Sequence, residues 1–388
     1  MQEEDEELLE KWFLIRNLSS GTEKTYRIAI KDFSKFIGKT PTELKAEADE
    51  EEASPIRLMD RKVSLNLLRY KKKLKGDGKS PKTVNLYFSA IKSFYKSFQI
   101  TLPDIKLDKG DIGQEKNIGK PLTRTDIHKL ISAASTRERA LIYLMALSGM
   151  GQQEARDLTI SKLLNSASQA TGIGIESVED LFKHEEQLLN EVLTLEIRRK
   201  KVNYRHYTFI PPEVTREIIA YLKERCYGRN EKIRISGEVE EPIFVNNYGG
   251  RLSRDSIVTN FRRIGQEAGF KKDKGSYAFW RSHALRKYFI STIINKIGEK
   301  VIADYLAGHK ISSQDRTYWQ ANPADLKNHY LKALPYLSLD EAKVKDVESE
   351  GFRELKEENR DLKRELDELS IKLGELDGFA EYLKKQRK

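Results

Sequence analysis

Helical periodicity governs most of this chain, and it gives way to strand alternation at one place. Apolar residues recur at helical spacing from Tyr26 to Ile37 and from Val84 to Phe98. Between Leu193 and Phe209 the pattern changes to alternating runs around a polar turn at 201–203, which is typical of a β-hairpin. Helical patterns return from Asp255 to Ala333. We therefore expect a mainly helical fold with a small antiparallel sheet.

Local signals indicate where individual elements begin. Thr22 precedes the first apolar stripe and is expected to cap its helix. Ser80 is followed directly by a proline, the usual order of a cap and a first helical turn. Thr123 with Asp126 forms a variant of the capping box. A further short strand is expected at residues 242–247.

The length and the distribution of apolar residues predict several domains. A chain of 388 residues exceeds one compact core and fits two or three domains. Residues 106–118 show little apolar periodicity and are predicted to be a linker. This linker separates a helical domain at 1–105 from a larger α/β domain at 119–342.

The last segment, 345–388, carries a repeat of its own. Asn359 falls on a position that specifies a parallel pair in coiled coils, while Gly374 and Gly378 weaken the final turns. We expect a coiled coil that joins two copies of the chain; the alternative is an amphipathic helix folded back on its own domain. The repeat consists of leucines in strict seven-residue register, Leu355, Leu362, Leu369, Leu376 and Leu383.

The charge balance favours a polyanionic partner. The chain holds 70 Lys and Arg against 60 Asp and Glu, a net charge of +10. Nucleic acid is the first partner that such an excess suggests, although many proteins of this charge bind none. A basic run, Lys71 to Lys73 with Lys75, is either a solvated loop or a phosphate contact.

Several classes of protein are disfavoured by what the sequence lacks. The single cysteine, Cys226, excludes an internal disulfide, and it makes no zinc-site spacing with the six histidines. The acidic start has no apolar core of a signal peptide, and no stretch approaches 18 apolar residues. We expect a cytoplasmic, nucleoid-associated protein with no membrane partner and no metal or other cofactor.

Three short motifs follow one another in the C-terminal half. His283 and Arg286 are three residues apart, a spacing that places both on one face of a helix. The sequence Leu-Ala-Gly-His ends at His309, and Tyr318 lies nine residues further on. Each motif alone is weak, but their order and spacing together are specific. Arginine and histidine suit a phosphoryl transition state, whose charge gathers on non-bridging oxygens.

This ordered set resembles the C-terminal signature of the tyrosine recombinase (phage integrase) family. The resemblance extends over the chain, with residues 1–105 similar to the family's core-binding domain and 119–342 to its catalytic domain. Segments such as SGMGQQEARDLTI and NPADLKNHYLKALPYL are similar to archaeal integrases, enzymes of mobile elements. The family acts on double-stranded DNA as a tetramer on paired sites. The coiled coil would supply a dimer contact.

The resemblance implies roles for the motif residues. Tyr318 would attack the phosphate, which forms a 3′-phosphotyrosyl bond and frees a 5′-hydroxyl. His283 would act as acid or base, Arg286 would hold the phosphate, and His309 would bond a non-bridging oxygen. The family's hairpin lysine, which protonates the leaving oxygen, corresponds to Lys201, with Lys200 as the second choice. Neither His206 nor His329 falls in a motif, and both are expected to be ordinary polar positions.

The chain departs from the family pattern at one position. The family has a further arginine in a motif that here appears as Ser-Gly-Met-Gly-Gln-Gln-Glu, and Gly151 stands at the arginine position while Glu154 keeps the acidic one. Arg156 lies five residues beyond and could take over the role. Alternatively the arginine is missing and the protein is impaired or only binds DNA, or the glycine is an engineered substitution.

Three rival functions stay open at this point. The first is a non-catalytic DNA-binding member of the same fold that acts as an accessory factor. The second is a topoisomerase-like relaxing enzyme with the same tyrosine chemistry, disfavoured because the motif spacing fits recombinases better. The third is a coiled-coil scaffold whose basic surface is incidental.

Overall fold

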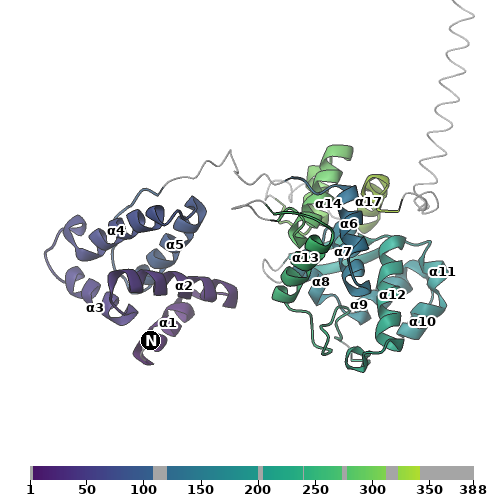
Figure 1. Cartoon of the computed structure of the whole chain (residues 1–388), viewed down its shortest axis with the longest axis horizontal. Coiled ribbons are helices and arrows are strands. Elements are labelled where there is room, and N and C mark those ends of the chain that lie inside the picture. Colours follow the sequence, from purple (N-terminus) through teal and green to yellow (C-terminus); the bar gives the residue numbers. More distant parts are fainter. Residues whose placement is uncertain are drawn as a thin grey trace, which may run out of the picture. The chain divides into compact units, whose positions relative to one another are not determined.

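The computed structural model describes residues 3–107, 120–199, 204–238, 240–272, 278–311 and 322–340. The described residues fall into two compact units, one within Met1–Lys116 and one within Asn117–Lys388. Figure 1 shows the first unit in purple to blue and the second from blue through teal and green to yellow. Most of the linker predicted at 106–118 and the whole coiled coil predicted at 345–388 lie outside the described residues.

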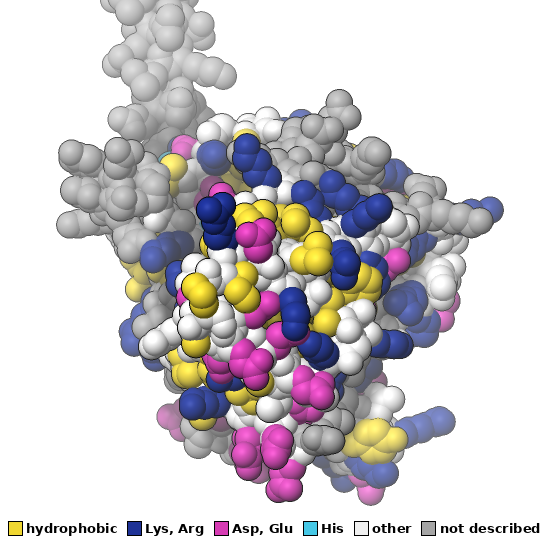
Figure 2. All heavy atoms as spheres, turned by 90° about the vertical axis from the view of Figure 1, so that its left-hand side faces the viewer, with side chains coloured by type: hydrophobic (Ala, Val, Ile, Leu, Met, Phe, Trp, Pro, Cys, Tyr) yellow, Lys and Arg dark blue, Asp and Glu magenta, His cyan; other side chains and the backbone are white. Residues whose placement is uncertain are grey.

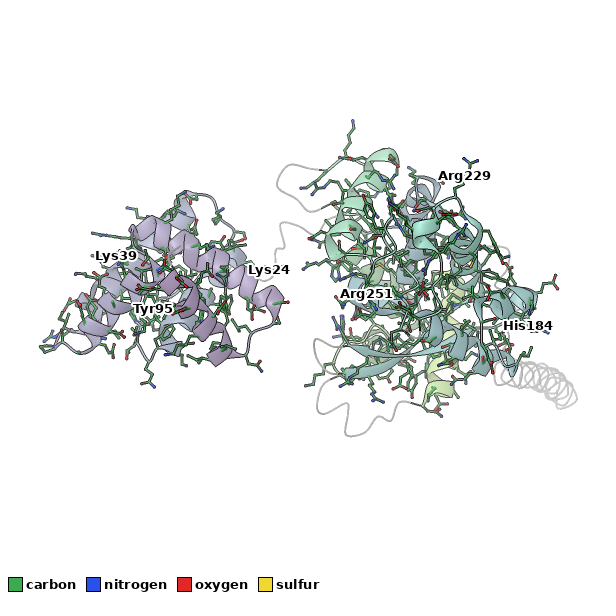
Figure 3. The ribbon with its side chains drawn as sticks, turned by 90° about the horizontal axis from the view of Figure 1, so that it is seen from below. Lys24, Lys39, Tyr95, His184, Arg229 and Arg251 are labelled. Atoms are coloured by element: carbon green, nitrogen blue, oxygen red, sulfur yellow. The ribbon has the colours of Figure 1, made fainter. Side chains whose placement is uncertain are left out.

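The first unit is a group of helices around an aromatic core. The indole of Trp12 packs on the rings of Tyr26 and Phe94, and its Nε1 donates to the Ser93 hydroxyl at 3.2 Å. Tyr95, labelled in Figure 3, is buried among the same helices. The elements are α1 (Glu3–Arg16), α2 (Ser20–Ile37), α3 (Pro41–Glu52), the 3-10 turn η1 (Leu58–Asp60), α4 (Lys62–Gly76) and α5 (Pro81–Ser97).

The second unit is built around a helix that is buried on every side. All residues of α7 from Ala140 to Ser148 are buried, and α7 contacts α12, α14 and strand β2. Figure 1 shows it between α12 and α14. A helix that is apolar around its circumference belongs in a core. The helices are α6 (Arg124–Ser132), α7 (Thr136–Ser148), α8 (Gln152–Asp157), α9 (Ile160–Thr171), α10 (Val178–Lys183), α11 (Glu185–Leu188), α12 (Pro212–Tyr227), η3 (Glu231–Ile233), α13 (Arg254–Glu267), α14 (Ser282–Ile297), α15 (Lys300–Leu306) and α17 (Pro323–Leu337).

The predicted hairpin forms the two-stranded sheet of the second unit. Strands β1 (Leu193–Arg199) and β2 (Tyr204–Ile210) pair antiparallel, from Leu193 opposite Ile210 to Arg199 opposite Tyr204. The prediction of a mainly helical fold with a small antiparallel sheet is therefore confirmed. The strand expected at 242–247 is wrong, because these residues form only isolated bridges, Thr159 with Pro242 and Val245 with Arg251.

The local start signals are confirmed in two cases and wrong in one. The Ser80 hydroxyl accepts a hydrogen bond from the Thr83 amide, and Thr123 and Asp126 form a reciprocal capping box. Helix α2, however, begins at Ser20 with Ser19 as its cap. Thr22 therefore lies inside the first turn of α2. The predicted cap was three residues too late, because Ser19 is the residue that precedes the helix.

The basic run at Lys71 to Lys75 belongs to α4 and is not a loop. Part of its charge is already paired, since Lys73 Nζ lies 3.1 Å from carboxylate oxygens of both Asp32 and Asp77. The face of this unit in Figure 2 accordingly mixes basic and acidic side chains, with the acidic ones gathered in the lower part of the view. None of the helices in the described ranges is long and apolar enough to span a membrane.

Candidate active site

Helix α14 carries His283 and Arg286 at its first turns. Its start is fixed by Trp280, which is buried, fills the space beside Gly265 and donates from Nε1 to the Phe261 carbonyl at 3.0 Å. The two predicted residues differ in burial, because Arg286 is only 3% exposed whereas His283 is exposed. His283 thus lies at the surface of the unit, whereas Arg286 points into its interior.

The Arg286 guanidinium is a buried cation with incomplete compensation. Its Nη2 donates to the Ala307 carbonyl, and its Nη1 lies 4.0 Å from Oε2 of Glu154. Burial lowers the pKa of Arg286 to about 10, and the Glu154 carboxylate acts in the opposite direction. A pKa of about 10 still leaves the group charged at neutral pH. A buried charge of this kind favours an incoming anion.

A second guanidinium, that of Arg199 at the end of β1, shares the same carboxylate. Its Nε lies 2.9 Å from Oε1 of Glu154, and its Nη1 donates to the Gly308 carbonyl at 2.8 Å. Glu154, on α8, is itself 7% exposed. Four parts of the chain therefore meet at one point: α8, β1, α14 and the turn that follows α15.

That turn positions His309. Gly308 has a φ of +68°, which favours glycine, and a Cβ there would lie 2.6 Å from the ring of His206. The next residue, His309, bonds Asp304 twice, through its backbone amide at 2.8 Å and through Nδ1 to Oδ1 at 2.9 Å. The imidazole is thus oriented through Nδ1, which leaves Nε2 for a ligand.

His206 belongs to this cluster, although it falls in no sequence motif. It is 1% exposed on β2, and its Nδ1 has no hydrogen-bond partner within the described ranges. Burial first, and then the charges of Arg286, Arg199 and His309, lower the pKa of His206 to about 4. The ring is therefore neutral at pH 7.

The pKa of His283 is lowered as well. The main cause is partial burial of the ring, although the residue reaches the surface. The positive charges of Arg281, Lys287, Arg286 and His309 act in the same direction. A lowered pKa makes the neutral, proton-accepting form the dominant one at pH 7.

Arg156 and Gly151, the pair singled out by the sequence, lie at different ends of α8. Arg156 donates from Nε to the Leu252 carbonyl and from Nη1 to Gln153 at 3.1 Å. Its own carbonyl accepts from Arg251, labelled in Figure 3, at 2.7 Å. Gly151 caps the start of α8 beside Glu154. Of the two, Gly151 is the one that adjoins the cluster.

The remaining predicted residues, Tyr318, Lys201 and Lys200, lie outside the described residues. Described positions flank both segments. Arg199 and Tyr204 border the hairpin turn, and the buried Ile311, two residues after His309, precedes the segment with Tyr318. In the parts of the chain with described side chains, no group of three or more His, Cys, Asp or Glu is arranged to hold a metal ion.

Comparison with known proteins places the chain in a family. Tyrosine recombinase XerA of Saccharolobus solfataricus is 23% identical over 330 residues, which cover 83% of this chain and 89% of that protein. Tyrosine recombinase XerD of Oceanobacillus iheyensis is 22% identical over 276 residues, covering 68% and 79% of the two chains. The solved structure of the Tn1549 transposon integrase in complex with circular intermediate DNA shares the fold, with a TM-score of 0.52, 16% identity, and coverage of 84% of this chain and 98% of that one.

A family model matches more than half of the chain. The phage integrase family model matches residues 120–325, the region that contains the cluster of Arg286, Arg199, Glu154 and the histidines. This match spans 206 of the 388 residues, counted from 120 to 325 inclusive. The chain therefore belongs to the phage integrase family.

Proposed function

We propose that this chain is a site-specific DNA recombinase that cleaves and rejoins duplex DNA through a 3′-phosphotyrosyl bond to Tyr318. Family membership supports site-specific recombination as the activity. The observation that carries the mechanism is the buried, charged Arg286 with His283 and His309 nearby, close to where the chain enters the segment of Tyr318.

Arg286 is suited to hold the scissile phosphate. Its guanidinium is fixed by the Ala307 carbonyl and by Glu154 before any ligand arrives. Donors that are oriented in advance, away from water, stabilise charge that develops on the non-bridging oxygens without further reorganisation. The planar fork of arginine matches two such oxygens at once.

His283 and Lys201 are proposed to move the protons. A phenol has a pKa of about 10 and is a poor nucleophile at pH 7. Neutral His283 would accept the phenolic proton of Tyr318 while the tyrosyl oxygen bonds to phosphorus. The bond from phosphorus to the 5′-oxygen breaks, and Lys201, or Lys200, gives that oxygen its proton. The phosphodiester energy is retained in the phosphotyrosyl bond, so rejoining needs no added energy source.

His309 is proposed to assist on a non-bridging oxygen. Asp304 holds its Nδ1 at 2.9 Å, which fixes the plane of the ring. In the protonated ring, Nε2 then carries a hydrogen that can be donated to the phosphate. This arrangement of a carboxylate behind a histidine is a common way to set the orientation of an imidazole.

The other parts of the chain are assigned by the same proposal. Residues 1–105 would form the core-binding domain on duplex DNA, 106–118 a linker, and 119–342 the catalytic domain. The segment 345–388 would pair protomers as a coiled coil, and four protomers would act on two DNA sites. This assembly would pass through a Holliday junction, as strand exchange requires.

The proposal is tested by trapping the covalent intermediate. Duplex sites are selected from a randomised library by binding to the protein and are then nicked at successive positions, so that cleavage releases a short fragment and cannot reverse. We expect a protein–DNA adduct on denaturing gels, lost in Tyr318→Phe. Tyr336→Phe is the matched control, because this nearby tyrosine is exposed and should leave the adduct unchanged.

A DNA-binding accessory protein is the second candidate, and Gly151 at the family's arginine position is what favours it. The same experiment separates the two functions. Tight binding to the selected sites without any adduct, at every nick position, would establish the accessory role and contradict the recombinase.

A further inference from the structure

We propose that Arg199 is a catalytic residue that contacts the scissile phosphate, and that it replaces from β1 the arginine that the family carries at the position of Gly151. The proposal rests on the proposed function, since it assigns a second phosphate ligand to the same reaction.

Strand geometry directs Arg199 inward. Alternate residues of β1, Leu193, Leu195 and Ile197, are buried, and Arg199 is the next residue on that face. Its neighbour Arg198 is exposed on the opposite face. Arg199 therefore ends an apolar row with a cation that faces the interior of the unit.

Two contacts orient the Arg199 guanidinium and leave one of its nitrogens available as a donor. Nε lies 2.9 Å from Oε1 of Glu154 in an ion pair, and Nη1 donates to the Gly308 carbonyl at 2.8 Å. These contacts leave Nη2 without a hydrogen-bond partner within the described part of the chain. A guanidinium held on two sides with a third nitrogen remaining is the arrangement that a phosphate oxygen can complete.

The local charge balance calls for an anion. Arg199 and Arg286 carry two positive charges, and the carboxylate that they share, Glu154, supplies one negative charge. The ring packed behind the turn, His206, is neutral at pH 7. Among these groups one positive charge is left over, and a phosphodiester brings a single negative charge. The Asp304 carboxylate, which also acts on Arg286, is paired with His309.

Gly151 is explained by space and not by backbone conformation. Its φ of −81° and ψ of 174° are extended values that any residue adopts. A Cβ at this position, however, would lie 2.5 Å from Oε2 of Glu154 and 3.1 Å from Nη1 of Arg286. A side chain at position 151 would therefore have to displace the Glu154 carboxylate from its ion pair with Arg199, and we infer that the second guanidinium comes from β1 instead.

Arg156, the candidate from sequence spacing, does not offer this guanidinium. Its hydrogen bonds run to Leu252 and Gln153, whereas Arg199 forms an ion pair with Glu154 and a hydrogen bond to the Gly308 carbonyl. Arg199 is also partly buried, where a cation acts on an anion with less screening than at the surface.

The first test compares single variants on the nicked duplexes selected as above. We expect Arg199→Ala to slow adduct formation by about 10²- to 10³-fold, as is typical for the loss of one oriented donor. Arg199→Lys keeps the charge but not the fork and should fall between Ala and the parent. Arg198→Ala is the matched control, because it removes the same charge from the opposite face of the strand and should react at the parental rate.

The second test separates chemistry from a merely structural role. In Gly151→Arg/Arg199→Ala the Glu154 carboxylate is released and a guanidinium returns at position 151, so we expect at least part of the rate to be regained. Glu154→Gln/Arg199→Ala removes the unpaired carboxylate without restoring a guanidinium and should stay slow. Thermal unfolding and binding of the same duplex are measured for every variant.

The outcomes that overturn the inference are specific. They are a parental rate in Arg199→Ala, full recovery in Glu154→Gln/Arg199→Ala, or a faster reaction in Gly151→Arg with Arg199 intact. The last result would mean that the family's own arrangement is the working one. A parent protein that binds the duplex but forms no adduct would instead contradict the proposed function, and the inference with it.

Discussion

His206 is a neutral, buried histidine that lies among the cations of the cluster. His206 is stacked parallel to Tyr204 and packs against Gly308, and its pKa is lowered to about 4 mainly by burial. Because the ring stays uncharged, it fills the space behind Arg199 and Arg286 without adding a third positive charge.

His206 predicts a loss of stability in acid. The unfolded chain binds a proton near the ordinary pKa of 6.5, whereas the folded chain binds it only near 4. Stability should therefore fall as the pH drops from about 6.5 towards 4, by at most about 3 kcal/mol at roughly 1.4 kcal/mol per pKa unit. Urea unfolding of the parent and of His206→Asn at pH 4 to 7 measures this, and an equally steep pH dependence in both would contradict it.

His283 predicts how the cleavage rate depends on pH. The group acts as a base in its neutral form, and its pKa lies below the ordinary 6.5. The rate of adduct formation should therefore be constant near pH 7 and fall in acid with a midpoint below 6.5. His283→Gln should be slow and lack this inflection. His184→Gln, at a partly exposed position (Figure 3), should retain it.

At the scale of elements, the turn between α15 and the segment of Tyr318 determines the geometry of the cluster. The carbonyls of Ala307 and Gly308 accept from Arg286 and Arg199, and the next residue is His309. Three groups of the site thus depend on the path of three consecutive residues. This path needs a glycine at position 308 for two reasons. The backbone is left-handed there, and a Cβ would collide with the His206 ring.

Replacing Gly308 by alanine should cost more free energy of unfolding than the left-handed backbone alone explains. Gly298 has a similar φ, +79°, but nothing lies within 4 Å of an added Cβ, whereas at Gly308 the His206 ring does. Gly298→Ala should cost about 1–2 kcal/mol in the free energy of unfolding. Gly308→Ala should cost about 1–3 kcal/mol more, because the ring must move. Equal costs in parallel urea titrations would show that the contact with His206 does not matter.

Elements that depend on neighbouring residues could be predicted from the sequence. The caps at Ser80 and Thr123 and the presence of the hairpin follow from local spacing. The start of α2 was placed one turn late because Ser19 and Thr22 are both good caps. The prediction of a strand at 242–247 was wrong because a short apolar run can form isolated bridges to other segments as readily as it pairs in a sheet.

The site was predictable only in part, for a related reason. The spacing of His283, Arg286 and His309 is contained in the sequence, and so is their likeness to a family. The contact of Arg199 with Glu154 joins residues 45 positions apart, and no periodicity encodes it. Continuing the buried row of β1 past Ile197 would have indicated that Arg199 faces inward, but not which group it meets.

At the scale of the whole molecule, two compact units and a heptad segment divide the proposed work between DNA binding, chemistry and assembly.

The heptad segment predicts an oligomer that forms without DNA. Deleting residues 345–388 should shift the mass in solution from dimer to monomer, as measured by light scattering. The deletion should leave the adduct rate on a single nicked site within a few-fold. A mass unchanged by the deletion would place the self-association elsewhere or nowhere.

The central claim is the identity of the nucleophile. It is tested most directly by digesting the trapped adduct with trypsin and nuclease and locating the nucleotide-bearing peptide by mass spectrometry. The proposal predicts one modified residue, Tyr318. A nucleotide on Tyr305, Tyr330 or Tyr336, the other tyrosines close to it in sequence, or no modified peptide at all, would contradict it.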